Sequence, residues 1–180
     1  MLDLQEKYKK EAMPAIRERL GCKNIMSCPK IIKVVVNTGV GRIAKESGMI
    51  DDIRKDLSSI TGQWPVLVAA KKSISTFKIR KGMPAGLKVT LHGKKMYDFL
   101  YRLISIAFPR SRDFRGIERK NIDQNGNLNI GIKEHIIFPE AMSDDIRKVF
   151  GLEVNIVTSA KDKEEAEVLF ESLGFPFKNK

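Results

Sequence analysis

Residues 30–42 read Lys-Ile-Ile-Lys-Val-Val-Val-Asn-Thr-Gly-Val-Gly-Arg, a β-branched run that ends at two closely spaced glycines. A run of this kind, bounded by a turn signal, is typical of a strand because branched side chains pack well on a pleated surface. Side chains alternate between the two faces of a strand. One face of this strand carries Ile32, Val34 and Val36, and the other carries Lys33, Val35 and Asn37. The sequence therefore predicts a sheet with one apolar face, called the dry back here, and an opposite face, the front, that binds a polar ligand. Beside the front lies a turn where Gly39 and Gly41 leave backbone N–H groups uncovered.

The net charge of the chain is concentrated in one block. The 180 residues include 33 Lys and Arg against 22 Asp and Glu, a net charge of +11. Residues 71–120 hold 14 of these basic residues and only 3 of the acids, so the rest of the chain is neutral overall. A strongly basic protein favours a polyanionic partner, either nucleic acid or an acidic membrane surface. Because the excess is segregated, we expect phosphate contacts from this block.

Several classes of protein are excluded by what the sequence lacks. Cys22 and Cys28 have neither zinc-type spacing nor a neighbouring Cys or His cluster. No apolar run approaches the length of a membrane span, and the first residues do not resemble a signal peptide. We therefore expect a cytoplasmic protein with reduced thiols, no metal, no cofactor and no membrane partner.

Apolar periodicity predicts helices over residues 2–20, 49–60, 96–107, 143–150 and 162–173. Gly21, Gly62 and Gly174 are expected to end the first, second and last of these, and Pro109 the third. Pro14 should kink or divide the first helix. Asp162 and Glu165 have the spacing of a capping box at the start of the last helix.

Further strands are expected at 65–70, 87–91, 128–132 and 152–157. The run at 65–70 is short and wholly apolar, which is typical of a buried strand. In the strand at 87–91 the apolar residues alternate with Lys88 and Thr90, and His92 follows, so it repeats the dry back and polar front of the first strand. Asn125-Gly126 between residues 117–122 and 128–132 predicts a hairpin.

These elements predict an α+β fold: a two-layer, largely antiparallel sheet with helices packed on one face and the other face open. We expect one domain spanning residues 1–180. Residues 71–86 are too basic for a core and too long for a tight turn, so they are expected to form a projecting functional loop that is mobile in the free protein.

An alternative function comes from Gly39, Gly41 and Ala44, which fit the dinucleotide-binding pattern after a strand and before a helix. This would make the protein a nucleotide-dependent enzyme. However, the acidic ribose partner expected about 20 residues further on is missing, since Ser58 and Ser59 occupy that region. No second strand-helix-strand unit follows, so the enzyme is the weaker interpretation.

Isolated residues of chemical interest have simpler structural explanations. His92 is explained as a polar strand residue and His135 as a partly buried structural histidine, since neither stands in a catalytic or metal-binding spacing. Trp64 could be a stacking platform, but a Trp beside Pro65 at a strand entrance is more often part of the core. No aromatic residue can be assigned to the polar front, which favours recognition of RNA shape and backbone.

The sequence also resembles one known family at several ordered stretches. They are Val-Val-Asn-Thr-Gly-Val-Gly at 35–41, Ile-Thr-Gly-Gln at 60–63, Ala-Lys-Lys-Ser-Ile at 70–74, Phe-Lys-Ile-Arg-Lys-Gly-Met-Pro at 77–84, Lys-Val-Thr-Leu at 88–91, Met-Tyr-Asp-Phe-Leu at 96–100, Pro-Arg-Ser-Arg-Asp-Phe-Arg-Gly at 109–116, Gly-Asn-Leu-Asn-Ile-Gly-Ile-Lys-Glu-His-Ile-Ile-Phe-Pro-Glu at 126–140 and Leu-Gly-Phe-Pro-Phe at 173–177. These stretches resemble the fifth protein of the bacterial large ribosomal subunit, the family that binds 5S ribosomal RNA. Thr38 and Ser111 depart from it, since an apolar residue is common at both positions.

The resemblance implies a non-enzymatic protein of the central protuberance of the large subunit. The partners it implies are 5S rRNA, 23S rRNA, the peptidyl-site tRNA, the thirteenth protein of the small subunit in that subunit's head, and neighbouring proteins of the protuberance. No small-molecule substrate is implied.

The residues expected to contact RNA fall into three groups. The rRNA contacts are Lys33, Asn37, Thr38, Gly39, Gly41, Gln63, Lys71, Lys72, Lys88, Thr90 and His92. The tRNA contacts are Ser75, Thr76, Phe77, Lys78, Arg80, Lys81 and Gly82, and further basic contacts are Arg110, Arg112 and Arg115.

Overall fold

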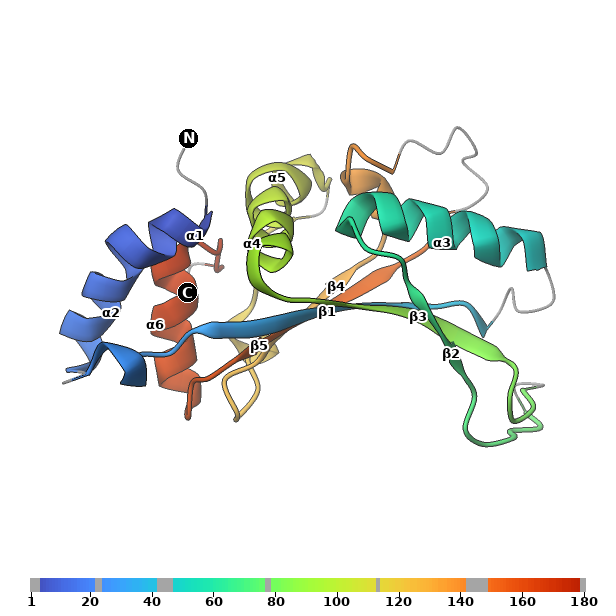
Figure 1. The fold of residues 1–180 in the computed structure, drawn as a ribbon, viewed down its shortest axis with the longest axis horizontal. Helices are drawn as coiled ribbons and strands as arrows, with labels where there is room; N and C mark the ends of the chain where they lie inside the picture. Colours follow the sequence, from blue (N-terminus) through green and yellow to red (C-terminus); the bar gives the residue numbers. More distant parts are fainter. Residues whose placement is uncertain are drawn as a thin grey trace. The chain divides into compact units, whose positions relative to one another are not determined.

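The computed structural model describes residues 4–21, 24–41, 47–76, 79–112, 114–141 and 149–178, and contains a five-stranded antiparallel sheet (Figure 1). The strands are β1 (Ile31–Gly39), β2 (Val66–Ala69), β3 (Pro84–Leu91), β4 (Leu128–Ile132) and β5 (Leu152–Thr158), in the spatial order β2-β3-β1-β5-β4. The predicted α+β class is confirmed. No described helix is both long and apolar enough to cross a membrane.

The chain forms two compact units that interleave along the sequence. The first contains residues 1–34, 92–130 and 155–180, and the second contains residues 35–91 and 131–154. The expectation of one domain over residues 1–180 stays a prediction.

The first unit begins with a helix that a π turn divides shortly before its proline. It consists of α1 (Leu4–Lys7), a π turn η1 (Tyr8–Ala12) and α2 (Met13–Leu20), and it ends at Gly21, whose φ is +63°. The wider π turn ends at Ala12, and Pro14 lies in the first turn of α2, the part of a helix where proline is best tolerated. The predicted division at Pro14 thus takes the form of a π turn. Apolar side chains at four-residue spacing are buried along one face.

Three further helical segments of this unit run consecutively. They are α4 (Gly93–Arg102), the π turn η4 (Leu103–Ala107) and α5 (Phe108–Arg110). The helix therefore continues past Pro109 to Arg110, because Pro109 again lies in a first turn, after a π turn. The closing helix α6 (Lys163–Leu173) ends as expected at Gly174, with φ +88°. Helix α1 packs against α4, and η1 and α2 pack against α6.

The predictions of a capping box and of a hairpin are each confirmed only in part. Glu165 accepts a hydrogen bond from the backbone N–H of Lys161 at 2.9 Å, while the side chain of Asp162 makes no capping bond. Before β4 the chain forms the 3₁₀ turn η5 (Arg119–Asn121) and a single bridge between Ile122 and Leu128, so residues 117–122 are no strand. The turn itself is present, but the Asp123 carboxylate organises it by accepting from Asn125 and Asn127.

Ion pairs join three segments of the first unit. The Arg119 guanidinium contacts Glu167 at 2.5 Å and Glu171 at 2.7 Å, and Arg19 contacts Glu171 at 3.2 Å. Arg119 also lies over the ring of Phe177. These contacts hold η5, α2 and the C-terminal segment against α6. Arg119 therefore serves the fold, although it belongs to the basic block of the sequence.

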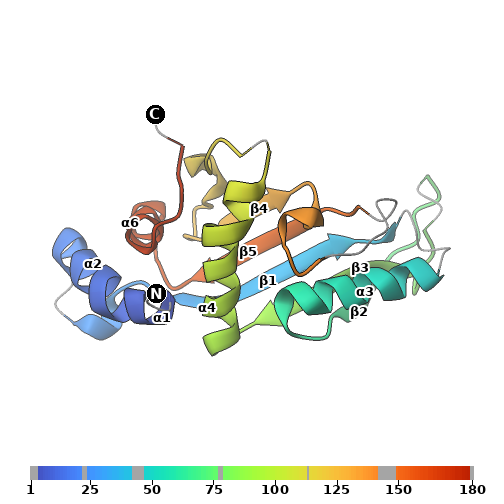
Figure 2. The same cartoon turned by 90° about the horizontal axis from the view of Figure 1, so that it is seen from above.

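The second unit has one helix-covered face. Helix α3 (Ser47–Thr61) lies over one side of β2 and β3, as both views show (Figures 1 and 2). Its buried Ile53, Leu57 and Ile60 face the sheet, whose side chains Val36, Leu87 and Val89 are at most 1% exposed. The 3₁₀ turn η6 (His135–Ile137) also belongs to this unit. The sheet of this unit thus has the apolar, buried face that the sequence predicted.

Strand β2 contradicts the prediction of a buried strand. It lies at the edge of the sheet, paired only with β3, and Val66, Leu67 and Val68 are 65%, 43% and 38% exposed. An apolar run predicts a strand but not how many neighbours that strand has. The dry face of β1 also begins later than predicted, because Ile32 is 47% exposed. The helix expected at 143–150 falls largely on residues 142–148, outside the described part of the chain.

Candidate nucleic-acid interface

The open front of the second unit is formed by alternating residues of three adjacent strands. In the antiparallel pairing, Val66 lies opposite Lys88 and Val68 opposite Gly86, so these four residues point to the same side. Leu87 and Val89 point to the dry back, where α3 covers them. Lys88 is exposed and Thr90 half-buried. Lys88 and Thr90 therefore stand on the front, as predicted.

Asn37 joins this front from β1. A Cβ placed at Gly86 would lie 3.6 Å from the Asn37 side-chain oxygen and 3.0 Å from the Thr38 backbone oxygen. The amide of Asn37 therefore lies over the glycine of β3, and the lack of a side chain at Gly86 leaves room for it. The half-buried amide is held on a rigid central strand, where it can both donate to and accept from a ligand. Asn37, Lys88 and Thr90 thus form one polar surface.

An exposed aromatic residue stands at the edge of this unit. Trp64 is 55% exposed, so the prediction that it belongs to the core is wrong. The Arg54 guanidinium of α3 lies 4.8 Å from the ring centroid, and its Nε donates to the Pro65 carbonyl at 3.2 Å. Gln63, the preceding residue, is exposed. Trp64 thus stands exposed at the entrance of β2, while the absence of an aromatic residue from the polar front stays a prediction.

Thr38 does not have the position that the sequence suggested. Thr38 is 2% exposed, and its hydroxyl donates to the Gly151 carbonyl at 2.7 Å, so we remove its side chain from the proposed contacts. Alternation explains this, since position 38 shares the dry face with Val36. Gly39 ends β1 and is exposed, and the Val40 N–H between the two glycines donates to the Ala85 carbonyl. Contacts from Gly39 and Gly41 stay a prediction. The Ala44 position of the dinucleotide pattern lies outside the described residues.

Two predicted contacts belong to the first unit. Lys33 is half-buried, and His92 is exposed with its Nδ1 3.3 Å from the Ile32 carbonyl oxygen. The exposed Arg110, Arg112 and Arg115 also belong to this unit. The block of residues 71–120 is thus shared between both units, and phosphate contacts from this block stay a prediction.

The basic loop continues the β2–β3 hairpin. Hydrogen bonds join Ala70 to Met83 at its base and Ile74 to Ile79 further out, and Ser73 accepts from the Lys81 N–H. The exposed side chains here include Lys71, Lys72, Ser75, Thr76, Arg80 and Lys81, and Gly82 turns the chain with φ +91°. Phe77 and Lys78 lie outside the described residues. The hairpin presents its cations to solvent, although its mobility in the free protein stays a prediction.

The titratable residues of the second unit do not suggest catalysis. His135 is 2% exposed, stacks on Phe150 with 3.9 Å between ring centroids, and accepts from the Phe150 N–H through Nδ1. Burial lowers the pKa of His135, while the charges of Asp56 and Glu134 act in the opposite direction. This is the structural histidine that the sequence predicted. Among the described residues, no group of three or more Cys, His, Asp or Glu could hold a metal ion.

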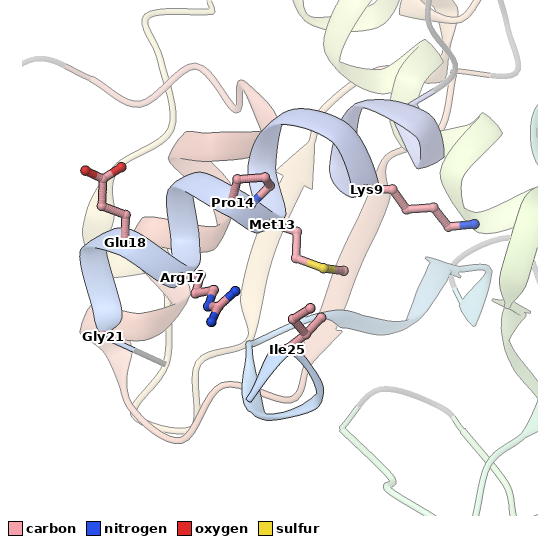
Figure 3. A pocket seen from close by; sticks show the side chains of 7 residues that line it. All are labelled: Lys9, Met13, Pro14, Arg17, Glu18, Gly21 and Ile25. Atoms are coloured by element: carbon pink, nitrogen blue, oxygen red, sulfur yellow. The ribbon is translucent and has the colours of Figure 1, made fainter. Parts of the chain in front are cut away.

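A shallow cavity of about 670 Å³ lies in the first unit between the N-terminal helix and the turn η2 (Ile25–Ser27) (Figure 3). Met13, Pro14 and Ile25 supply apolar lining, and Lys9, Arg17 and Glu18 stand around it. None of the residues predicted to contact RNA lines this cavity. Its charges have both signs, which does not favour a phosphate ligand.

Comparison with known proteins identifies the family. Residues 24–80 match the family model described as ribosomal protein L5, and residues 84–177 match the model for the C-terminus of the same family. The large ribosomal subunit protein uL5 of Halothermothrix orenii is 51% identical over 174 residues, with 97% of each chain covered. The protein of the same name from Caldanaerobacter subterraneus subsp. tengcongensis is 52% identical, covering 98% of this chain and 99% of its own. That of Thermotoga maritima is 46% identical over 97% and 95% of the two chains.

These matches confirm the resemblance noted from the sequence motifs and remove the nucleotide-dependent enzyme from consideration. The chain belongs to the ribosomal protein L5 family, whose members are structural, non-enzymatic proteins of the large ribosomal subunit.

Proposed function

We propose that this protein binds 5S rRNA through the open front of its second unit and helps to attach that RNA in the central protuberance of the large subunit. The observation that carries the proposal is the common face of Asn37, Lys88 and Thr90 on adjacent rigid strands, opposite a face packed with hydrocarbon. Amide and hydroxyl groups can hydrogen-bond to 2′-hydroxyl and phosphate groups, and the lysine supplies charge. Gln63 extends the set at the strand entrance.

The test is the affinity of the purified protein for 5S rRNA in a gel shift. The wild type should bind 5S rRNA in preference to another structured RNA of equal length. Asn37→Ala, Gln63→Ala and Thr90→Ala should each weaken binding about 5- to 150-fold, the effect of an unsatisfied hydrogen-bond partner of roughly 1–3 kcal/mol. Ser59→Ala, which changes an exposed polar residue of α3, is the matched control.

The melting temperatures of the variants distinguish binding from folding. They should all remain close to that of the wild type, because none of these side chains is fully buried. Lys88→Ala should also reduce the slope of log affinity against log salt by about one, since one phosphate contact is lost. If the three alanine variants bind normally, the sheet front is not the RNA surface, and the basic loops alone carry the affinity.

We propose a separate role for the tip of the β2–β3 hairpin, residues 73–83, as a contact for the peptidyl-site tRNA. Its exposed Arg80 and Lys81 offer phosphate contacts away from the Ala70–Met83 hydrogen bonds at the base. Replacing Ser75 to Gly82 with a short glycine linker retains that base. The shortened protein should fold and bind 5S rRNA normally, yet ribosomes that carry it should release tRNA faster. Unchanged tRNA release together with lost 5S binding would assign the hairpin tip to the other RNA.

The remaining partners follow from the family resemblance alone. We propose 23S rRNA and neighbouring proteins of the protuberance as contacts, and a bridge to the small-subunit head through that subunit's thirteenth protein. Cross-linking in assembled ribosomes tests these contacts, with Arg110, Arg112 and Arg115 as the exposed cations of the first unit available for them.

A further inference from the structure

Trp64 is the only tryptophan of the chain, and neither the fold nor the polar front accounts for its exposure. An indole that is 55% exposed contributes little to a core. The backbone around it is nevertheless fixed: Pro65 is buried, and the Pro65 carbonyl accepts from Arg54. The ring is therefore presented to solvent from a rigid strand entrance.

Arg54 prepares this ring for a particular kind of ligand. Its guanidinium lies 4.8 Å from the indole centroid and simultaneously donates to the backbone next to it, which ties the cation to the aromatic ring. An aromatic face beside a fixed cation offers stacking to a base and attraction to the phosphate that accompanies it. A base inside a double helix is already stacked on both faces. This ring therefore favours an unpaired base as its ligand.

The surroundings of Trp64 favour RNA over a protein partner. Gln63 precedes it, and the exposed valines of β2 follow it, in the same unit as the polar front of Asn37, Lys88 and Thr90. A protein strand that paired with the β2 edge would not need the Arg54 cation beside the Trp64 ring. A nucleotide uses both, because its base stacks on the ring and its phosphate is attracted to the cation. The net charge of +11 further favours a polyanion.

We propose that Trp64, held by Arg54, is a stacking platform for an unpaired base of the bound RNA. This inference rests on the proposed binding of 5S rRNA to the adjacent sheet front. A stacked base at Trp64 adds a base contact to an interface that otherwise recognises the backbone and shape of the RNA. Trp64 is the stacking residue, and Arg54 is its positioning residue.

The fluorescence of Trp64 provides a direct test, because no other tryptophan contributes to it. Addition of 5S rRNA should quench this fluorescence, since a stacked base contacts the indole. A fully paired RNA duplex of equal length should not, although it presents the same phosphates. Asn37→Ala should weaken the binding of 5S rRNA while the bound complex remains quenched.

Variants at position 64 separate stacking from general attraction. Trp64→Ala should weaken 5S rRNA binding about 5- to 150-fold, the range for losing one stacked base, with no change in the salt slope, because no phosphate contact is lost. Trp64→Phe should recover most of the affinity. Met26→Ala, which truncates a side chain that is 83% exposed, is the matched control and should bind as the wild type does.

The outcomes distinguish this inference from the function on which it rests. If the wild type binds 5S rRNA but its fluorescence is unchanged and Trp64→Ala binds normally, the stacking platform is wrong and the sheet-front proposal stands. If the wild type shows no preference for 5S rRNA, both fail. Fluorescence that changes only when other large-subunit proteins are added to the RNA complex would make Trp64 a protein contact and overturn the inference.

Discussion

Strands β1 and β2 both contain valines, and these valines differ strongly in burial. In β1, Val34 and Val36 are fully buried, whereas in β2, Val66 is 65% and Val68 38% exposed. The cause is position: β1 has β3 and β5 as neighbours, and β2 has only β3. Apolar residues on an edge strand are normally a liability, because they invite pairing with another chain. The exposed valines of β2, which follow Trp64 in the chain, favour an edge that a partner covers.

The first prediction compares matched valines on the two strands and has the largest expected effect. Val36→Ala should lower the free energy of unfolding by about 2 kcal/mol, through lost burial and the cavity that remains. Val66→Ala should change it by no more than about 0.5 kcal/mol, since the side chain is mostly in solvent already. Denaturant unfolding of both variants measures the difference. Equal losses would mean that the edge of β2 is packed in solution.

The second prediction makes the same comparison with hydroxyl groups. Thr38→Val should cost about 1 kcal/mol of unfolding free energy, because it removes a buried bond to the Gly151 carbonyl. Thr90→Val, on the front, should leave stability unchanged and weaken RNA binding. Thermal unfolding and the 5S gel shift, run on both variants, check this. A Thr38→Val protein that loses RNA binding at full stability would restore Thr38 to the interface.

Much of this arrangement was predictable from local sequence patterns. The 3.6-residue period identified α3, α4 and α6, and alternation placed Asn37, Lys88 and Thr90 on the front, because each pattern records which side of one element is buried. The exposure of β2 and Trp64 could not be found this way. It depends on which strand lies beside which, and that is set by contacts distant in sequence. Thr38 was misassigned because it was grouped with its polar neighbours instead of with its own face.

The two prolines have a common local setting. Pro14 was expected to kink or divide its helix and Pro109 to end its helix, and each lies in a first turn that follows a π turn. A π turn contributes an extra residue, and the helix can then restart with proline at a position that needs no N–H donor. The hydrophobic period is nearly unaffected by one such turn, so apolar spacing does not reveal it.

The third prediction concerns the buried histidine of η6. Because burial lowers the pKa of His135, the unfolded chain binds its proton more readily than the folded one. Stability should therefore be complete above the ordinary histidine pKa of 6.5 and fall as the pH decreases below it. His135→Gln should flatten this fall, while the exposed His92→Gln should retain it. Denaturant midpoints measured across this pH range decide the matter, and an unaltered pH dependence in His135→Gln would contradict the assignment.

The last prediction places a charge on the edge strand, where the smallest effect on folding is expected. Val68 points to the front and is 38% exposed, so Val68→Lys should keep the unfolding free energy within about 0.5 kcal/mol of the wild type. An added lysine on an exposed edge opposes pairing between chains, which should reduce aggregation measured by light scattering.

The same lysine should reach RNA if the front is the binding surface. The slope of log affinity against log salt should then increase by about one, because one phosphate contact is gained. Val89→Lys is the contrasting variant on the neighbouring strand: its side chain is 1% exposed on the dry back, so it should fail to fold, since an unpaired charge would be buried there. A stable Val68→Lys protein whose salt slope is unchanged would mean that RNA does not extend to β2, and that the exposed valines serve another partner.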